Sequence, residues 1–184
     1  RPEMEAIKSP VIGYVGALWT SRLDLTLLEN LAQKRPDWNF VYIGPEDDNF
    51  KNSILHKMPN VFMLGPRRPE DLASYIKYFD VCMNPQYVNP ITIGNYPRKV
   101  DEYLALGKAT IVTQTEPMLD FKDYILLAKN EQEYIDGIQH LLDTDSPELH
   151  EERRTFALSH SWENSIELMS KACAEVAAKQ NKPF

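Results

Sequence analysis

The chain has 184 residues, of which 43% are hydrophobic and 26% are charged, so the sequence predicts one globular domain over residues 1–184 with a substantial core. Its net charge of -7 argues against a nucleic-acid partner, because such partners require a positive surface that covers many phosphates. Two cysteines and the lack of a long apolar segment predict a cytoplasmic protein with neither a disulfide framework nor a membrane span, while peripheral membrane association stays open.

Segments typical of strands and of helices alternate from the beginning of the chain. Residues 11–18 are apolar and contain glycines, which predicts a buried strand, and residues 21–24 resemble a capping box that begins a helix. Leucines at helical spacing predict that this helix extends over residues 24–34. Residues 39–43 and 61–64 are further strand-like segments, and each is followed by Gly-Pro.

The second half of the chain continues the alternation. A helix is predicted at 69–79, a strand at 80–84 and, after a loop, a helix at 97–107 that ends at Gly107. The remaining predicted elements are strands at 109–113 and 124–128, a helix at 131–142, and two helical segments after Ser146, the last over 162–180.

This order of elements predicts the fold class. Strand and helix alternate about six times, and the strands are apolar along their length, which is typical of a parallel sheet covered on both faces. We therefore expect an α/β domain with a Rossmann-like, doubly wound parallel sheet of about six strands and additional C-terminal helices.

The loops after the strands hold the candidate binding residues, because ligands of open parallel sheets lie at the carboxyl ends of the strands, near helix N-termini. Five cations lie at or near the first turns of three predicted helices, namely Arg22, Arg67, Arg68, Arg98 and Lys99. Each costs about 0.3–1 kcal/mol because the helix dipole is positive at that end, although neighbouring acidic residues offset part of this cost. Any one of these cations alone is more simply a solvated surface residue, but the five together indicate a bound anion.

Lys99 and Glu102 are three residues apart and therefore share one face of their predicted helix, while Val100, Tyr103 and Leu104 form an apolar face toward the sheet. One interpretation is a surface salt bridge. The functional interpretation is that Lys99 holds a diphosphate and Glu102 accepts hydrogen bonds from a ribose diol.

Residues 96–108, which read YPRKVDEYLALGK, resemble the donor-site helix of retaining GT-B-type glycosyltransferases of group 1, the family 4-like class. Residues 13–16 resemble the first strand and phosphate loop of that family, residues 59–65 a later strand, and residues 161–163 the start of a late helix. The similar segments occur in the same order over nearly the whole chain. The resemblance implies the C-terminal, donor-binding half of a GT-B fold.

The resemblance also implies roles for individual residues. Lys99 and Arg22 are the implied catalytic residues, because they neutralise the diphosphate as it leaves. Gly16 allows the backbone to approach the phosphate, Glu102 binds the ribose, and Arg67 lies in the loop that borders the base. The implied donor-binding residues are Gly16, Arg67, Asn89, Gly94, Asn95 and Glu102.

The chain departs from the family pattern at two positions. Gly94 lies eight residues before Glu102, where many members carry a glutamate that helps to bind the sugar, and Ala17 replaces the usual arginine. A different donor or lost activity are two explanations. We favour a third, in which the sugar is held by Asn89, Thr92 or Asn95.

The implied activity is a hexosyl transfer from a nucleotide-diphosphate sugar to a glycan or lipid-linked acceptor in polysaccharide biosynthesis, without a metal or other cofactor. An N-terminal acceptor domain is expected before Arg1, so we interpret the chain as a fragment that is inactive alone. The last helix, within residues 161–184, is expected to cross back to that domain. The alternatives are a nucleotide-sugar epimerase of the same fold and a non-catalytic nucleotide-binding or interaction domain.

No metal site is expected. Asp143-Thr144-Asp145 has the Asp-X-Asp form of metal-dependent transferases of another fold, but it follows a predicted helix, so we interpret it as a helix end. The four histidines are too far apart in the sequence for a local metal motif.

Overall fold

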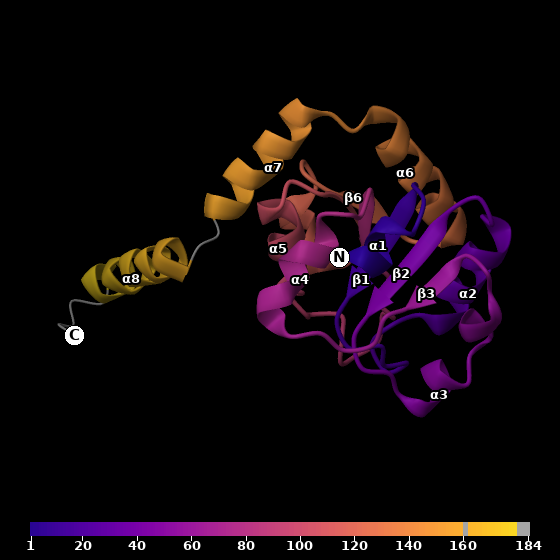
Figure 1. Ribbon diagram of the computed structural model, residues 1–184. Helices are drawn as coiled ribbons and strands as arrows, with labels where there is room; N and C mark the ends of the chain where they lie inside the picture. Colours follow the sequence, from indigo (N-terminus) through magenta and orange to yellow (C-terminus); the bar gives the residue numbers. More distant parts are fainter. Residues whose placement is uncertain (160–161, 180–184) are drawn as a thin grey trace.

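The computed structural model describes residues 1–159 and 162–179 and shows a six-stranded parallel sheet with helices on both faces (Figure 1). The strand order is β3-β2-β1-β4-β5-β6. This arrangement confirms the predicted Rossmann-like, doubly wound sheet. The strands are β1 (Val11–Val15), β2 (Asn39–Ile43), β3 (Val61–Met63), β4 (Val81–Asn84), β5 (Ala109–Thr113) and β6 (Leu126–Ala128).

All six strands agree with predicted segments, and β2 and β5 have the predicted bounds. The first strand ends at Val15, three residues earlier than predicted. Its end is set by Gly16, whose φ of +138° lies in a region that side chains with a Cβ rarely adopt. The chain therefore turns out of the sheet at the position where a phosphate loop is implied.

The helices also follow the prediction, apart from short segments that lack a helical period. Helical turns at residues 2–5, 48–51, 54–57 and 116–121 were not predicted from the sequence. The helices are α1 (Pro2–Glu5), α2 (Leu25–Lys34), α3 (Asp48–Lys51), α4 (Pro69–Ile76), α5 (Lys99–Ala105), α6 (Glu131–Thr144), α7 (Pro147–Ser159) and α8 (Trp162–Lys179), with 3-10 helices η1 (Ile54–Lys57) and η2 (Glu116–Phe121).

The predicted capping box at residues 21–24 is wrong. The cap of α2 is Asp24, whose carboxylate accepts the backbone N–H of Leu27 at 3.0 Å. Leu23 instead forms an isolated antiparallel β-bridge with Gln86 in the loop after β4. Before α2 the chain forms a turn, in which the N–H groups of Arg22 and Leu23 donate to the Trp19 carbonyl at 2.8 and 2.9 Å. Arg22 therefore lies in a loop rather than in the first turn of the helix.

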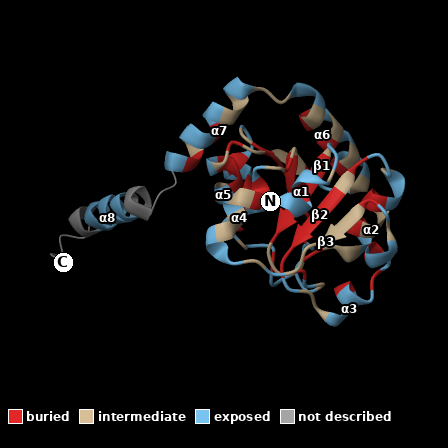
Figure 2. Ribbon diagram, viewed as in Figure 1, coloured by how far each residue is buried: buried red, intermediate tan, exposed pale blue. Residues whose placement is uncertain are grey.

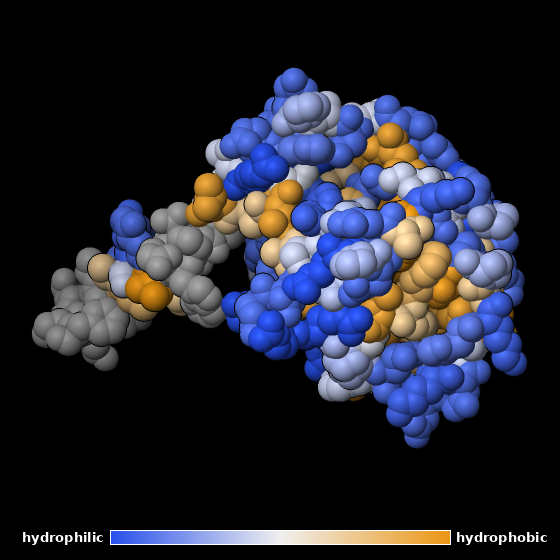
Figure 3. Space-filling view, viewed as in Figure 1, coloured by the Kyte–Doolittle hydropathy of each residue, from blue (hydrophilic) through white to orange (hydrophobic). Residues whose placement is uncertain are grey.

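Two apolar layers enclose the sheet. Leu28 of α2 and Ile138 of α6 are buried on one face, whereas Tyr75 of α4 and Tyr103 of α5 are buried on the other. Figure 2 shows the resulting pattern, with buried strands and helices whose outer sides are exposed. β3 is an edge strand of intermediate burial, and apolar side chains reach the surface over it in Figure 3.

The topology places a ligand site between β1 and β4. These strands are neighbours in the sheet, but β1 leads to α2 on one face and β4 leads to α5 on the other. The loops at their carboxyl ends therefore diverge, which is the arrangement that creates a ligand crevice in doubly wound sheets.

The interpretation of residues 143–145 as a helix end is confirmed. α6 ends at Thr144, and the Asp145 carboxylate accepts a hydrogen bond from Arg153 at 2.6 Å and pairs with His150 at 2.6 Å. Among the described residues, no group of three His, Cys, Asp or Glu side chains is placed to hold a metal ion. The helices in the described ranges include none with the length and hydropathy of a membrane span.

The C-terminal helix α8 lies beyond the end of α7, away from the sheet (Figure 1). Its Ile166, Met169 and Val176 side chains are each more than half exposed. The predicted crossing of residues 161–184 to another domain stays a prediction, and residues 160–161 and 180–184 lie outside the described residues.

Candidate functional site

Lys99, the first residue of α5, reaches across to the end of β1. Its Nζ donates a hydrogen bond to the Tyr14 hydroxyl at 2.6 Å and lies 4.1 Å from the centroid of the Tyr14 ring. A Cβ atom added to Gly16 would lie 2.6 Å from the same Nζ. The structure therefore brings Lys99 and Gly16 together, as the predicted diphosphate site requires.

Tyr14 is a site residue that was not predicted from the sequence. Its side chain is buried, it accepts the Lys99 hydrogen bond, and its hydroxyl donates to the Ala17 carbonyl at 3.2 Å. Burial raises the pKa of Tyr14, although the Arg22 charge opposes this, so the side chain is a neutral phenol. Tyr14 is one of several apolar residues in β1, and no spacing in the sequence distinguishes it.

Three charges act on one another at this edge of the sheet. Burial lowers the pKa of Lys99 to about 8; the negative charge of Glu102 opposes this change and the positive charge of Arg22 adds to it. Within the described residues, Lys99 forms no ion pair with a carboxylate. The surface salt bridge between Lys99 and Glu102, the alternative interpretation, is therefore not formed.

Arg22 and Glu102 both present exposed side chains beside Lys99. The Arg22 carbonyl accepts the N–H of Tyr87 at 2.8 Å, which holds the loop before α2 against the loop after β4. Gly16, Arg22, Lys99 and Glu102 thus converge on the crevice between β1 and β4. A partly buried ammonium beside an exposed guanidinium, over a glycine turn, is suited to binding a diphosphate.

Arg67 is directed elsewhere. Its Nε donates to the Tyr75 hydroxyl at 2.9 Å, and its guanidinium lies 3.8 Å from the carboxylate of Glu3. The loop that carries Arg67 still borders the site, because the Gly65 carbonyl accepts the N–H of Gly44 at 3.1 Å and Gly44 lies against Gly16. The contact of Arg67 with a nucleotide base stays a prediction.

The loop of residues 85–96 is held by its own polar side chains. The Asn89 carboxamide oxygen accepts the N–H groups of Ile91 and Thr92 at 2.8 and 3.0 Å, and its NH₂ group donates to the Ser21 carbonyl at 3.1 Å. Thr92 is only 2% exposed and its hydroxyl bonds within the loop. The suggestion that Thr92 holds the sugar is therefore wrong, since its side chain is turned inward.

Gly94 and Asn95 occupy the exposed end of this loop. A Cβ atom added to Gly94 would meet no atom within 4 Å, so the backbone there leaves room for a side chain. Asn95 is partly buried and donates its N–H to the Thr92 carbonyl at 2.9 Å. Sugar contacts of Asn89, Gly94 and Asn95 stay predictions.

A hollow of about 530 Å³ occurs at the opposite edge of the sheet, far from this chemistry. Its charged groups are occupied with partners, since Arg35 binds Asp37 and Lys108 donates to the carbonyls of Lys77 and Phe79. We therefore place the functional site at the carboxyl edge, where the Lys99 ammonium has no carboxylate partner among the described residues.

Comparison with known proteins identifies a glycosyltransferase family. The profile of the family described as "Glycosyl transferases group 1" matches residues 9–144. The chain is also 27% identical over 159 residues to the Bacillus subtilis (strain 168) protein named "Putative teichuronic acid biosynthesis glycosyltransferase TuaH", covering 83% of this chain and 40% of that protein.

Solved structures share the fold. Anabaena Alr3699/HepE in complex with UDP has a TM-score of 0.73 and 15% identity over 97% of this chain and 51% of its own. Sucrose-phosphate synthase from Thermosynechococcus elongatus has a TM-score of 0.72 and 19% identity over 97% of this chain and 48% of its own. The chain thus has the Rossmann-like fold of one half of a GT-B glycosyltransferase, and it spans 40% of the B. subtilis relative and about half of each of these two structures.

Proposed function

Because the chain belongs to the glycosyl transferases group 1 family, we propose that it is the donor-binding domain of a hexosyltransferase that uses a nucleotide-diphosphate sugar. The observation that carries this proposal is the position of Lys99. Its ammonium lies over the Gly16 turn, partly buried and without a carboxylate partner among the described residues. The carboxyl edge of the sheet thus supplies local positive charge in a protein whose net charge is -7.

The reaction separates a sugar from a nucleoside diphosphate, and negative charge accumulates on the departing diphosphate. Lys99 and Arg22 stabilise that charge where it develops, which lowers the barrier to transfer. In this proposal the two cations perform the charge neutralisation that a divalent metal performs in other transferases, so no metal is required. Glu102 accepts hydrogen bonds from the ribose hydroxyls.

The full reaction requires a second domain that binds the acceptor, a glycan or a lipid-linked glycan. Closure of that domain over the donor excludes water and completes the site, so the domain alone binds donor without transferring sugar. We also propose a cytoplasmic location and a role in polysaccharide assembly, and the words "teichuronic acid biosynthesis" in the name of the B. subtilis relative support the role in assembly.

The test is a thermal-shift panel of nucleoside diphosphates and nucleotide sugars, followed by calorimetry. A ligand that binds only the folded state raises the melting temperature by mass action. UDP is the first probe because the HepE structure contains it. We expect a shift with one nucleotide family and its loss in Lys99→Ala.

If no nucleotide binds to the domain or to the full-length protein, the proposal is contradicted and a non-catalytic interaction domain is favoured. Binding that appears only in the full-length protein would show that the second domain completes the donor site. Interconversion of free nucleotide sugars by the full-length protein, without an acceptor, would indicate the epimerase alternative.

A further inference from the structure

Two hollows lie on either side of Tyr87, on the α2 side of the loop after β4. One has a volume of about 400 Å³ and extends to the beginning of α6, where Asn130 and Glu131 line it. The other has a volume of about 460 Å³ and extends to α3, where Asn49 and Asn52 line it. Both volumes lie in the usual range for ligand pockets, roughly 300–1,000 Å³.

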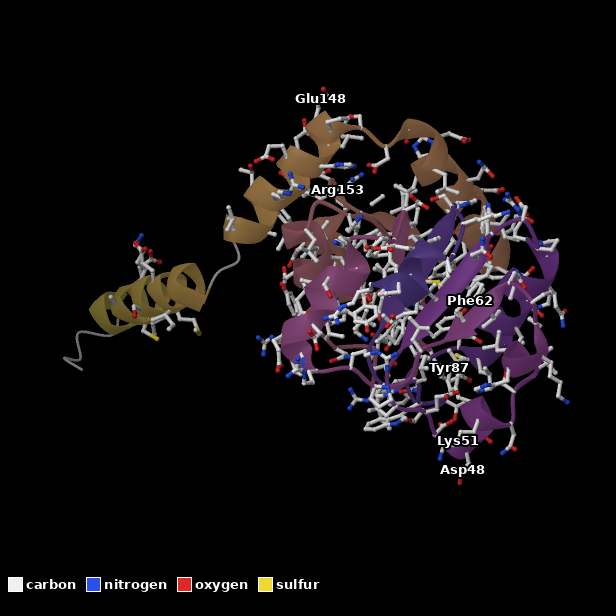
Figure 4. The ribbon with its side chains drawn as sticks, in the orientation of Figure 1. Asp48, Lys51, Phe62, Tyr87, Glu148 and Arg153 are labelled. Atoms are coloured by element: carbon white, nitrogen blue, oxygen red, sulfur yellow. The ribbon has the colours of Figure 1, made fainter. Side chains whose placement is uncertain are left out.

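The two hollows share three lining residues, namely Asp24, Thr26 and Tyr87. The two hollows therefore adjoin along the beginning of α2, with Tyr87 lining both, and we refer to them together as the groove. Figure 4 shows Tyr87 below the sheet and above α3, which carries Asp48 and Lys51. Lys99, Glu102 and Gly16 line neither half, so this groove is separate from the donor site.

Tyr87 is 50% exposed although hydrogen bonds hold its backbone. Its N–H donates to the Arg22 carbonyl at 2.8 Å, and its own carbonyl accepts a hydrogen bond from the buried Thr92 hydroxyl. A large aromatic surface on a fixed turn loses little conformational entropy when a ligand covers it.

The polar groups around the ring present mainly acceptors. Asn49 donates its NH₂ group to the Thr20 hydroxyl at 3.0 Å, and Asn52 donates to the Asp48 carbonyl at 2.7 Å. Within the described residues, the carboxamide oxygens of both asparagines accept no hydrogen bond. Glu29 uses one carboxylate oxygen for Ser53 at 2.7 Å, and its other oxygen faces no described donor.

We propose that this groove binds a neutral oligosaccharide, with one sugar ring stacked on Tyr87 and its hydroxyl groups donating to the acceptors on each side. Sugar rings present an apolar C–H face to an aromatic ring and hydroxyl donors at their edges, which matches this surface. The choice of a carbohydrate also rests on the proposed transferase function, because the full enzyme would then bind a glycan acceptor.

The charge of the groove selects against anionic glycans and nucleotides. Asp24, Glu29 and Glu131 line it together with Lys129, and Lys34 pairs with Glu131, so the acidic residues still outnumber the cations. Uronic acids or phosphates bound there would face a net negative surface. The groove therefore favours neutral sugars over acidic ones of the same length.

The test uses ligand-observed NMR and calorimetry on the 184-residue protein. The probes are cellotetraose, maltotetraose, tetra-N-acetylchitotetraose and, as the acidic control, tetragalacturonate. We expect at least one neutral probe to bind at millimolar concentration and tetragalacturonate not to bind. Tyr87→Ala should weaken that binding about tenfold, whereas Tyr87→Phe retains the ring and should keep most of it.

Ile93→Ala is the matched control, since Ile93 is an exposed apolar side chain of the same loop that lines neither hollow. Asn49→Ala is a second variant of the groove on a different element, and it should weaken binding even if Tyr87→Ala folds poorly. The proposal that the groove binds a neutral oligosaccharide would be overturned if no neutral probe bound. It would also be overturned if wild type, Tyr87→Ala and Asn49→Ala bound the probes equally. UDP binding, measured in parallel, tests the donor site separately, because none of the four substitutions changes Lys99, Arg22 or Glu102.

Discussion

The Nζ atom of Lys99 lies 2.6 Å from the hydroxyl oxygen of Tyr14, although the two residues are 85 positions apart in the chain. This hydrogen bond joins the end of β1 to the beginning of α5 across the crevice of the sheet. It holds the Lys99 ammonium over the Gly16 turn, where the proposed diphosphate binds. Tyr14 is therefore a positioning residue for Lys99.

Tyr14→Phe tests that relationship. The ring is retained, but the acceptor of the Lys99 hydrogen bond is lost, so we expect UDP affinity to fall roughly three- to tenfold, from the loss of one hydrogen bond to a charged group. The measurement is calorimetry of UDP binding. The lost bond to the Ala17 carbonyl should cost about 0.5–1.5 kcal/mol in unfolding free energy, measured in urea.

Tyr42→Phe provides the matched control. Tyr42 is the register partner of Tyr14 in β2, and its hydroxyl is buried with no hydrogen-bond partner among the described residues. Removing that hydroxyl should leave UDP affinity unchanged and should not lower stability. Equal losses of UDP affinity in the two variants would show that any change in this layer disturbs the site.

UDP binding should depend on pH through Lys99. Burial lowers the pKa of Lys99 to about 8, so its charge is present below pH 8 and is lost above it. Phosphate groups complete their second ionisation near pH 6, so the ligand charge is constant above pH 7. We expect affinity to decrease between pH 7.5 and 9, by up to about tenfold per pH unit. Lys99→Arg, which stays charged, should remove this dependence in calorimetric titrations.

Lys99 should reduce the stability of the empty domain. A lysine whose pKa is lower in the folded than in the unfolded state makes unfolding more favourable below that pKa, and the cost disappears as pH rises from about 8 toward the unfolded value. Lys99→Met should therefore raise the unfolding free energy at pH 7 by about 1 kcal/mol while abolishing UDP binding. A large loss of stability would instead assign Lys99 a structural role.

Glu102→Ala should weaken nucleotide binding without affecting folding, because the Glu102 side chain is exposed. If Glu102 binds the ribose diol, wild type should prefer UDP to 2′-deoxy-UDP, and the variant should bind the two about equally. Competition calorimetry with both nucleotides measures this difference. Glu152→Ala, at an exposed acidic position on α7, is the control and should keep the preference.

Gly94→Glu introduces the glutamate that many family members carry. Because a Cβ atom at Gly94 meets no atom within 4 Å, we expect the unfolding free energy to change by no more than about 0.5 kcal/mol. If the loop end faces the sugar, the variant should gain affinity for a nucleotide sugar relative to the free nucleoside diphosphate. Equal changes for both ligands would place Gly94 away from the sugar.

The sequence alone predicted the fold because the signals for strands and helices are local. Apolar runs and helical spacing depend on neighbouring residues, so all six strands were found and β2 and β5 had the predicted bounds. The short helical turns at α3 and η1 were missed because a single turn contains no repeating period. The cap of α2 was misplaced because Leu23 bonds to Gln86, which is distant in the sequence.

The candidate site was predicted only as far as residue types and strand ends allow. Parallel strands bring their carboxyl ends to one edge, so the meeting of Gly16 and Lys99 followed from the topology. The sequence could not show that the Tyr14 hydroxyl accepts a hydrogen bond from Lys99, that Arg67 bonds to Tyr75 or that Thr92 is buried. Those features depend on side-chain directions and on contacts between distant segments, which only the packed tertiary structure determines.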